Sequence, residues 1–90
     1  MYQLEYTTNF KRQYKMMLKR GCKKDLIQRV ITAIANKTPL AAKYKAHKLG
    51  GNYEDCWECH VQPDWLLIWW TDEASNTLTL VATGTHADLF

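Results

Sequence analysis

Long apolar runs are absent from this sequence: none approaches the roughly 20 residues that a membrane-spanning helix requires. Residues 1–5 lack both the basic region and the apolar region of a secretory signal peptide. Three cysteines, an odd number with no secretory context, indicate reduced thiols rather than a disulfide framework. We therefore expect a cytoplasmic protein without a membrane partner, and 90 residues leave room for a single domain, residues 1–90.

A second pair of cysteines is also missing, which bears on the one C-x-x-C motif, Cys56 to Cys59. In a strand, the Cα atoms of these two residues would be about 10 Å apart and their side chains would point to opposite faces. A disulfide requires Cα atoms within about 7 Å, and zinc sites of this type draw on further cysteine or histidine ligands. We therefore expect no disulfide between these cysteines, no metal site and no cofactor.

Lysine and arginine are absent from the second half of the chain. All 12 lie within residues 1–48, together with two acids, whereas residues 49–90 carry seven acids. A basic half of this kind favours a polyanionic partner, nucleic acid first, although solvated lysine-rich helices would give the same count. Any cationic side chain on the C-terminal strands must therefore be a histidine.

The hydrophobic pattern changes its period near the middle of the chain. Apolar residues first recur at helical spacing, as in Phe10, Tyr14, Met17 and Leu18, and after residue 51 they alternate with a period of two. The predicted elements are a strand at 2–6, helices at 10–20 and 24–36, strands at 55–61, 65–71 and 77–82, and an irregular tail at 85–90. Such short connections require antiparallel neighbours. The expected fold class is therefore α+β, with a β-α-α unit followed by an antiparallel meander of three or four strands.

Titratable side chains gather around the turn between the first two strands of this meander. Glu58 and His60 are two residues apart on a predicted strand, so they share one face, and Asp64 follows in the turn. His47 and His86 each lie close to a glycine, where loops can bring them to the same end of the sheet. Two interpretations remain open at this point, an acid–base site and an exposed polar face without chemistry.

Metal-independent cleavage of RNA suits this set of side chains. Attack of a 2′-hydroxyl on the adjacent phosphate needs a base, an acid for the 5′-oxygen and a cation for the charge on phosphorus. Histidines that titrate near neutral pH can supply the base and the acid, and a protonated histidine or a lysine can supply the cation. The acids Glu58 and Asp64 are too few to argue for a metal cage.

Three segments, in this order, resemble the RelE/YafQ-type toxins of bacterial toxin–antitoxin systems. They are Tyr44-Lys45-x-His47-x-Leu49-x-Gly51, Glu58-Cys59-His60-Val61-x-Pro63-Asp64-Trp65-Leu66-Leu67-Ile68 and Thr83-Gly84-Thr85-His86-Ala87-x-Leu89-Phe90. The resemblance covers nearly the whole chain and is strongest from residue 40 to residue 90. RelE-like relatives use arginine and lysine at their active sites, and the second half of this chain has neither. The chain is therefore similar to the histidine-rich, YafQ-type branch.

This resemblance implies a RelE-like, microbial-ribonuclease-like fold and a ribosome-dependent endoribonuclease, or mRNA interferase, that inhibits translation. It also implies a cognate antitoxin that silences the toxin in a hetero-oligomer. YafQ-type members carry active-site residues at the positions of His47, His60, Asp64, His86 and Phe90. Glu58 falls where such members carry an acid that can be Asp.

The roles expected from the resemblance divide these residues into three groups. His86 is the expected general acid and Glu58 or His60 the expected general base, with His47 left open as a third candidate for the base. His47 and Asp64 are expected to position or charge-balance the phosphate and the neighbouring rings. Phe90, Lys45 and Lys48 are expected to bind substrate. The expected contacts to ribosomal RNA come from the first helix and are Lys11, Arg12, Lys15, Lys19 and Arg20.

Some relatives of this fold inhibit DNA gyrase without cutting RNA. A non-catalytic toxin or binding module that acts through its basic face is therefore the alternative to an enzyme. The two hypotheses differ in whether His47, Glu58, His60 and His86 converge in space.

Overall fold

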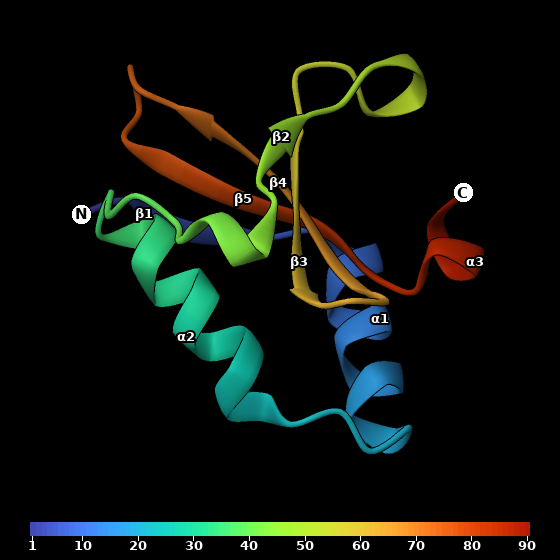
Figure 1. Ribbon diagram of the computed structural model, residues 1–90. Helices are drawn as coiled ribbons and strands as arrows, with labels where there is room; N and C mark the ends of the chain where they lie inside the picture. Colours follow the sequence, from blue (N-terminus) through green and yellow to red (C-terminus); the bar gives the residue numbers. More distant parts are fainter.

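A five-stranded sheet organises the protein, and the computed structural model describes all residues, 1–90 (Figure 1). The strands are β1 (Gln3–Tyr6), β2 (His47–Lys48), β3 (Trp57–Gln62), β4 (Trp65–Asp72) and β5 (Thr77–Gly84). They are arranged in the order β1-β5-β4-β3-β2. Strand β1 pairs with β5 in parallel, and all other neighbours are antiparallel. The expected α+β class and the four-stranded meander are therefore confirmed.

Two longer helices, α1 (Thr8–Lys19) and α2 (Lys24–Ala35), lie on one side of this sheet (Figure 1). Helix α1 begins where the hydroxyl of Thr7 accepts a hydrogen bond from the backbone N–H of Phe10 at 3.0 Å, an N-cap. It ends at Gly21, whose φ of 95° lies in the left-handed region that terminates helices. The predicted helix boundaries agree with these ends to within two residues.

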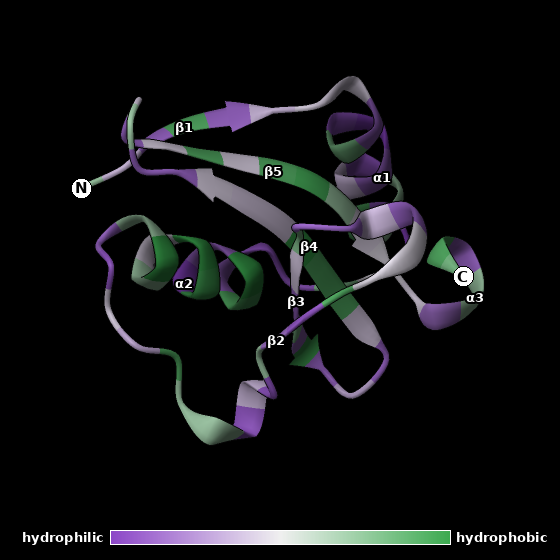
Figure 2. Cartoon of the chain, turned by 90° about the horizontal axis from the view of Figure 1, so that it is seen from above, coloured by the Kyte–Doolittle hydropathy of each residue, from purple (hydrophilic) through white to green (hydrophobic).

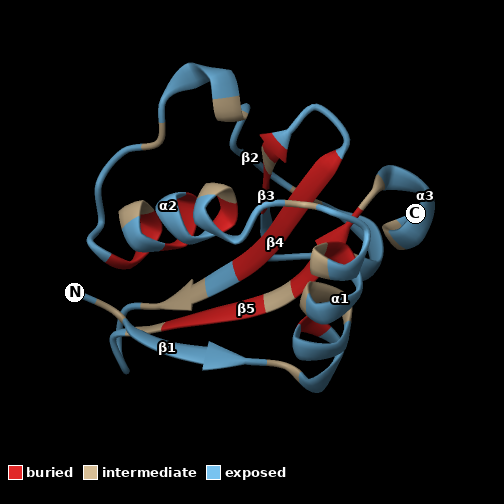
Figure 3. Cartoon of the chain, turned by 90° about the horizontal axis from the view of Figure 1, so that it is seen from below, coloured by how far each residue is buried: buried red, intermediate tan, exposed pale blue.

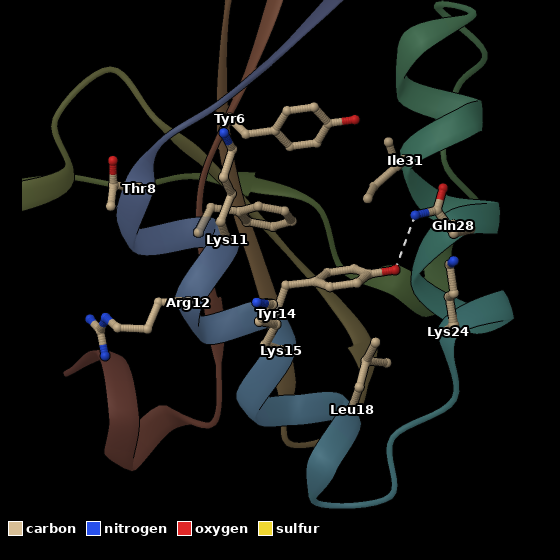
Figure 4. Close-up of a pocket in the computed structure, with 11 residues that line it drawn as sticks. Tyr6, Thr8, Lys11, Arg12, Tyr14, Lys15, Leu18, Lys24, Gln28 and Ile31 are labelled. Carbon is tan, nitrogen blue, oxygen red and sulfur yellow. Dashed lines mark hydrogen bonds between the residues drawn. The ribbon is translucent and has the colours of Figure 1, made fainter.

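A groove separates α1 from α2, although the two helices run in opposite directions as their short link predicts (Figure 4). It has a volume of about 760 Å³ and an aromatic floor that includes Tyr6, Phe10 and Tyr14. One hydrogen bond crosses between the helices, from the side-chain amide of Gln28 to the hydroxyl of Tyr14 at 3.1 Å. The two helices therefore contact the sheet more than they contact each other.

The core lies between these helices and the sheet. It includes Phe10 and Ile31 from the helices and Trp65 and Leu67 from β4, all buried. A smaller cluster of Cys56, Ile68 and Ala82 lies on the opposite face. Figure 2 shows hydrophobic residues along β4 and β5, and Figure 3 shows these central strands largely buried while β1 is exposed throughout.

The two cysteines of the C-x-x-C motif lie in separate clusters, as their strand predicts. Cys59 belongs to the main core, Cys56 belongs to the smaller cluster on the other face, and both are free thiols. Burial raises the pKa of Cys59 to about 12, and burial also raises the pKa of Cys56. Both thiols are therefore protonated and unreactive at neutral pH.

The predicted irregular tail after Gly84 is wrong, because residues 86–89 form a helical turn, α3 (His86–Leu89). Thr85 and Asp88 make a capping box in which each side chain accepts a hydrogen bond from the backbone N–H of the other. Leu89 packs against the smaller cluster, so α3 is fixed at both ends. None of the helices has the length and apolar character needed to cross a bilayer.

One buried hydrogen-bond pair should contribute strongly to stability. The indole N–H of Trp65 donates to the hydroxyl of Thr83 at 3.0 Å, and this hydroxyl donates to the carbonyl of Leu66 at 2.7 Å. Thr83→Val keeps the shape but leaves the indole N–H without an acceptor, so we expect a loss of about 1–3 kcal/mol in the free energy of unfolding. Urea denaturation measures this difference.

Thr79→Val is the matched control, because Thr79 is also a buried threonine of β5 but its hydroxyl makes no hydrogen bond to another group. Equal stability changes in the two variants would mean that the Trp65–Thr83 bond contributes nothing specific.

Candidate active site

Two adjacent strands bring an acid and two histidines to the sheet face opposite the long helices. Glu58 and His60 alternate with Cys59, which points into the main core, so both face away from α1 and α2. His47 lies directly opposite Glu58 in the β2–β3 register. The expected shared face of Glu58 and His60 is therefore present, and β2 adds His47 to it.

The carboxylate of Glu58 lies at the centre of this group and is buried, with 4% of the residue exposed. Its Oε1 atom is 3.3 Å from Nε2 of His47 and 4.0 Å from Nε2 of His60. Its Oε2 atom is buried without any hydrogen-bond partner. A buried carboxylate with one unsatisfied oxygen is costly for the fold, which is typical of a group retained for function rather than stability.

Both of these imidazole rings are oriented by backbone carbonyls. Nδ1 of His47 donates to the carbonyl of Lys45 at 2.8 Å, and Nδ1 of His60 donates to the carbonyl of Pro63 at 3.2 Å. Because a carbonyl only accepts, each Nδ1 carries the proton, and Nε2 is the nitrogen that can accept one. Each Nε2 atom is also the one nearer to Glu58.

The third histidine reaches the same group from α3. The ring of His86 lies 5.6 Å from the ring of His60, measured between centroids. Its Nδ1 atom donates to Oδ1 of Asp64 at 2.8 Å, and its backbone N–H donates to the same oxygen at 3.1 Å. These hydrogen bonds hold the pKa of Asp64 below its usual range and leave Nε2 of His86 free.

An ion pair with α1 holds α3 in place. The Arg20 guanidinium contacts the carboxylate of Asp88 at 2.7 Å, across 68 residues of sequence. This contact, and then the capping hydrogen bonds from Thr85, hold the pKa of Asp88 well below its usual range. The pattern of the sequence did not predict this pair, although the Thr85-x-x-Asp88 spacing is a recognisable capping signal.

The contacts of Asp64 and Asp88 that hold α3 should weaken in acid. The folded-state pKa values of Asp64 and Asp88 are both lowered, so their stabilisation is present above the unfolded value of about 3.9 and is lost as pH falls through the folded values. We expect the hold on α3 to weaken progressively as pH falls below about 4 and to be lost only below the folded-state pKa values, while the sheet remains folded. The NMR signals of the His86 and Leu89 amides, followed between about pH 6 and pH 2, would report this.

Asp88→Asn provides the comparison, because it keeps the size of the side chain and removes the charge that Arg20 contacts. Its α3 signals should already be shifted at pH 6. If they match those of the wild type, the Arg20–Asp88 pair does not hold α3.

The expected substrate-binding residues lie around this group without joining it. Phe90 is largely exposed, and its ring makes an edge contact with Tyr53 at 5.6 Å between centroids. Lys45 and Lys48 are exposed on either side of His47 in the chain. All three side chains are exposed, but Lys48 is the strand neighbour of His47, so its side chain points to the opposite face of the sheet.

The basic residues expected to bind ribosomal RNA lie on α1 and at its C-terminal cap. Lys11, Arg12 and Lys15 are exposed around the groove between α1 and α2 (Figure 4), and Lys19 is exposed at the end of the helix. Arg20 differs from them because its guanidinium already pairs with Asp88. Four of the five cations are therefore free for an anionic partner.

The site as a whole is a continuous row of titratable groups, from His47 through Glu58 and His60 to His86 and Asp64. Two imidazoles, each with Nδ1 bonded to an acceptor, lie close enough to act on the two sides of one phosphate. No three His, Cys, Asp or Glu side chains are arranged to hold a metal ion. The arrangement can take up one proton and deliver another without moving the backbone.

Comparison with known proteins agrees with this geometry. The family model of the bacterial toxin of type II toxin–antitoxin systems, YafQ, matches residues 2–90. The mRNA interferase toxin YafQ of Escherichia coli K12 is 37% identical over 88 residues, which are 97% of this chain and 94% of that protein.

Two solved structures have the same fold over their full length. The metal-bound toxin from Helicobacter pylori is 39% identical, with a TM-score of 0.94 and complete coverage of both chains. YafQ in the E. coli DinJ–YafQ complex is 34% identical, with a TM-score of 0.89 over 100% of this chain and 99% of that one. The predicted resemblance is thus confirmed, and the chain belongs to the YafQ family of bacterial toxins of type II toxin–antitoxin systems.

Proposed function

We propose that this protein is an mRNA interferase, an endoribonuclease that cuts mRNA by metal-independent acid–base catalysis and so inhibits translation. Its E. coli relative carries the name mRNA interferase toxin. The observation that carries the proposal is the pair of imidazoles of His60 and His86, 5.6 Å apart, each hydrogen-bonded through Nδ1. A binding module that acts only through its basic face does not require two oriented imidazoles at this distance.

The reaction begins when a 2′-hydroxyl of the mRNA attacks the phosphorus atom next to it. His60 is our choice of base, since its Nε2 atom can accept the hydroxyl proton and side-chain exposure of 20% lets substrate reach it. The bond from phosphorus to the 5′-oxygen breaks, and protonated His86 donates its Nε2 proton to that oxygen. The products are a 2′,3′-cyclic phosphate and a 5′-hydroxyl.

Glu58 is a positioning residue in this scheme. Its carboxylate is too deeply buried to touch a 2′-hydroxyl directly, but it faces Nε2 of both His47 and His60. It therefore stabilises the imidazolium that forms when His60 takes the proton, and it holds the ring of His47 beside it at 3.3 Å. Asp64 is also a positioning residue, because it accepts a hydrogen bond from Nδ1 of His86 and so orients that ring.

The remaining expected residues serve binding. Phe90, at the rim, stacks on a base beside the scissile bond, and Lys45 and Lys48 contact phosphates. The lysines and Arg12 of α1 contact ribosomal RNA, because phosphate contacts position a protein without reading sequence. The activity is ribosome-dependent and cytoplasmic, and a cognate antitoxin silences it in a hetero-oligomer, as DinJ is bound to YafQ in the E. coli complex.

Primer extension on a purified mRNA, with and without ribosomes, tests this proposal. We expect discrete new 5′ ends when wild-type protein and ribosomes are both present, and none with a His60→Ala/His86→Ala variant that still binds ribosomes. Absence of cleavage by the wild type under both conditions would refute the proposal. Inhibition of DNA gyrase supercoiling by the same preparation would then favour the binding module.

A further inference from the structure

A second groove, distinct from the one between the helices, opens beside the candidate active site. It has a volume of about 510 Å³ and lies between α2, the 3₁₀ turn at Ala42–Tyr44 and the β3–β4 turn. Arg29 enters it from α2, Lys43 and Lys45 from the 3₁₀ turn, and Gln62 from the end of β3. We call it the Arg29 groove. Its volume is within the range of about 300–1,000 Å³ usual for binding pockets.

The Arg29 groove is strongly positive. Arg29, Lys43 and Lys45 are exposed, and no aspartate or glutamate is among the residues that line it. None of these three cations takes part in any ion pair of the chain. Three unpaired cations around one groove repel each other until an anion enters.

The groove is continuous with the candidate active site through one residue. His60 is one of the residues that line the groove, and its ring, on the sheet face opposite α2, lies 5.6 Å from the ring of His86. An RNA strand whose scissile phosphate lies between His60 and His86 can therefore continue round the end of the sheet, past the β3–β4 turn at Gln62 and Pro63, toward Arg29. Tyr44 is half-buried at the wall, and the ammonium of Lys43 lies over its ring, 5.2 Å from the centroid.

We propose that the Arg29 groove holds the mRNA backbone on one side of the scissile bond, with phosphates bound by Arg29 and Lys43. This inference rests on the proposed function, since it assumes that the scissile phosphate lies at His60 and His86. Arg29 and Lys43 are then positioning residues: they set how tightly the strand is held, while the histidines carry out the proton transfers. Neither residue is part of the motifs that indicate the family.

The test compares two double variants with the same change in net charge. Arg29→Gln/Lys43→Gln removes two cations from the groove, and Lys23→Gln/Lys24→Gln removes two cations at the start of α2, outside it. A short fluorescent 2′-O-methyl RNA serves as the probe, because it has the phosphate backbone but no nucleophile and cannot be cut. Binding is measured by anisotropy over a series of salt concentrations.

For the groove variant we expect the slope of log affinity against log salt to become shallower by about 1.4, or about 0.7 for each lost phosphate contact. The control should keep the wild-type slope. In single-turnover cleavage, the groove variant should need a higher toxin concentration for half-maximal rate and reach the same maximal rate.

Three results would overturn the inference. The first is a groove variant whose salt slope equals that of the wild type. The second is a control variant that loses as much slope as the groove variant. The third is a groove variant that binds ribosomes more weakly but binds the probe as the wild type does. Failure of the proposed function would look different, because the wild-type protein would then cut no mRNA at any concentration, whatever the binding of the probe.

Discussion

His86→Ala is expected to lower the rate of single-turnover mRNA cleavage at least about a hundredfold, because a general acid contributes about 10²–10⁴ in rate. Hydrogen bonds to Asp64 fix the ring through Nδ1 and its own backbone N–H and leave Nε2 as the proton donor. His86→Gln should do no better, since an amide can donate a hydrogen bond but cannot deliver a proton. Rapid-quench measurement on ribosome-bound mRNA gives the rates.

Both variants should fold normally, bind ribosomes and bind an antitoxin, since more than half of the His86 side chain is exposed. Thermal unfolding and ribosome co-sedimentation are the controls. Cleavage at the wild-type rate by either variant would remove His86 from the mechanism, and the acid role would pass to His47 or His60.

Glu58→Met is expected to change stability and activity in opposite directions. It replaces a buried carboxylate that has one unsatisfied oxygen by an apolar side chain of similar size. We therefore expect the free energy of unfolding to rise by about 1–3 kcal/mol. Cleavage should fall at least about tenfold, because the imidazolium that forms on His60 loses its counter-charge and the ring of His47 loses its contact with the carboxylate.

Glu54→Met is the matched control, because it makes the same substitution at an exposed acid after the 3₁₀ turn at Gly51–Tyr53. Urea denaturation and single-turnover cleavage should both stay close to the wild-type values for this variant. A Glu58→Met protein that is less stable than the wild type would show that Glu58 supports the fold, and its loss of cleavage would then say little about chemistry.

The parts of the site that depend on local periodicity could be predicted from the sequence. Alternation along the predicted strand 55–61 places Glu58 and His60 on one face and separates Cys56 from Cys59, because the side-chain period of a strand is fixed. The helical stripe of Phe10 and its neighbours likewise predicted the buried side of α1. Each of these predictions needed only residues within one element.

Long-range contacts could not be predicted in this way. Nothing in residues 3–6 specifies a parallel partner, and β1 pairs with β5 only after two helices bring the chain back. Strand β2 has two residues, too few for a period, so the register that places His47 opposite Glu58 was not visible. Glu58 is buried in the fold, with His47 of β2 beside it at 3.3 Å, and alternation along β3 alone does not predict this burial.

The groove around Arg29 could likewise not be predicted from the sequence. In the sequence it is one of two cations on the second helix, and a solvated helix face explains it equally well. Only the fold brings it into a groove with Lys43 and Lys45, next to His60. Charge counts indicated a polyanionic partner but could not say which cations share one surface.

The identity of the nucleophile is the most direct test of the chemistry proposed for this site. A ribosome-bound mRNA with a single 2′-deoxynucleotide on the 5′ side of the mapped cleavage position lacks only the hydroxyl that attacks phosphorus. Cleavage at that position should disappear, and the unmodified mRNA should yield a 2′,3′-cyclic phosphate and a 5′-hydroxyl. Efficient cleavage of the deoxy-substituted mRNA, with a 5′-phosphate on the product, would contradict catalysis by His60 and His86 through the 2′-hydroxyl.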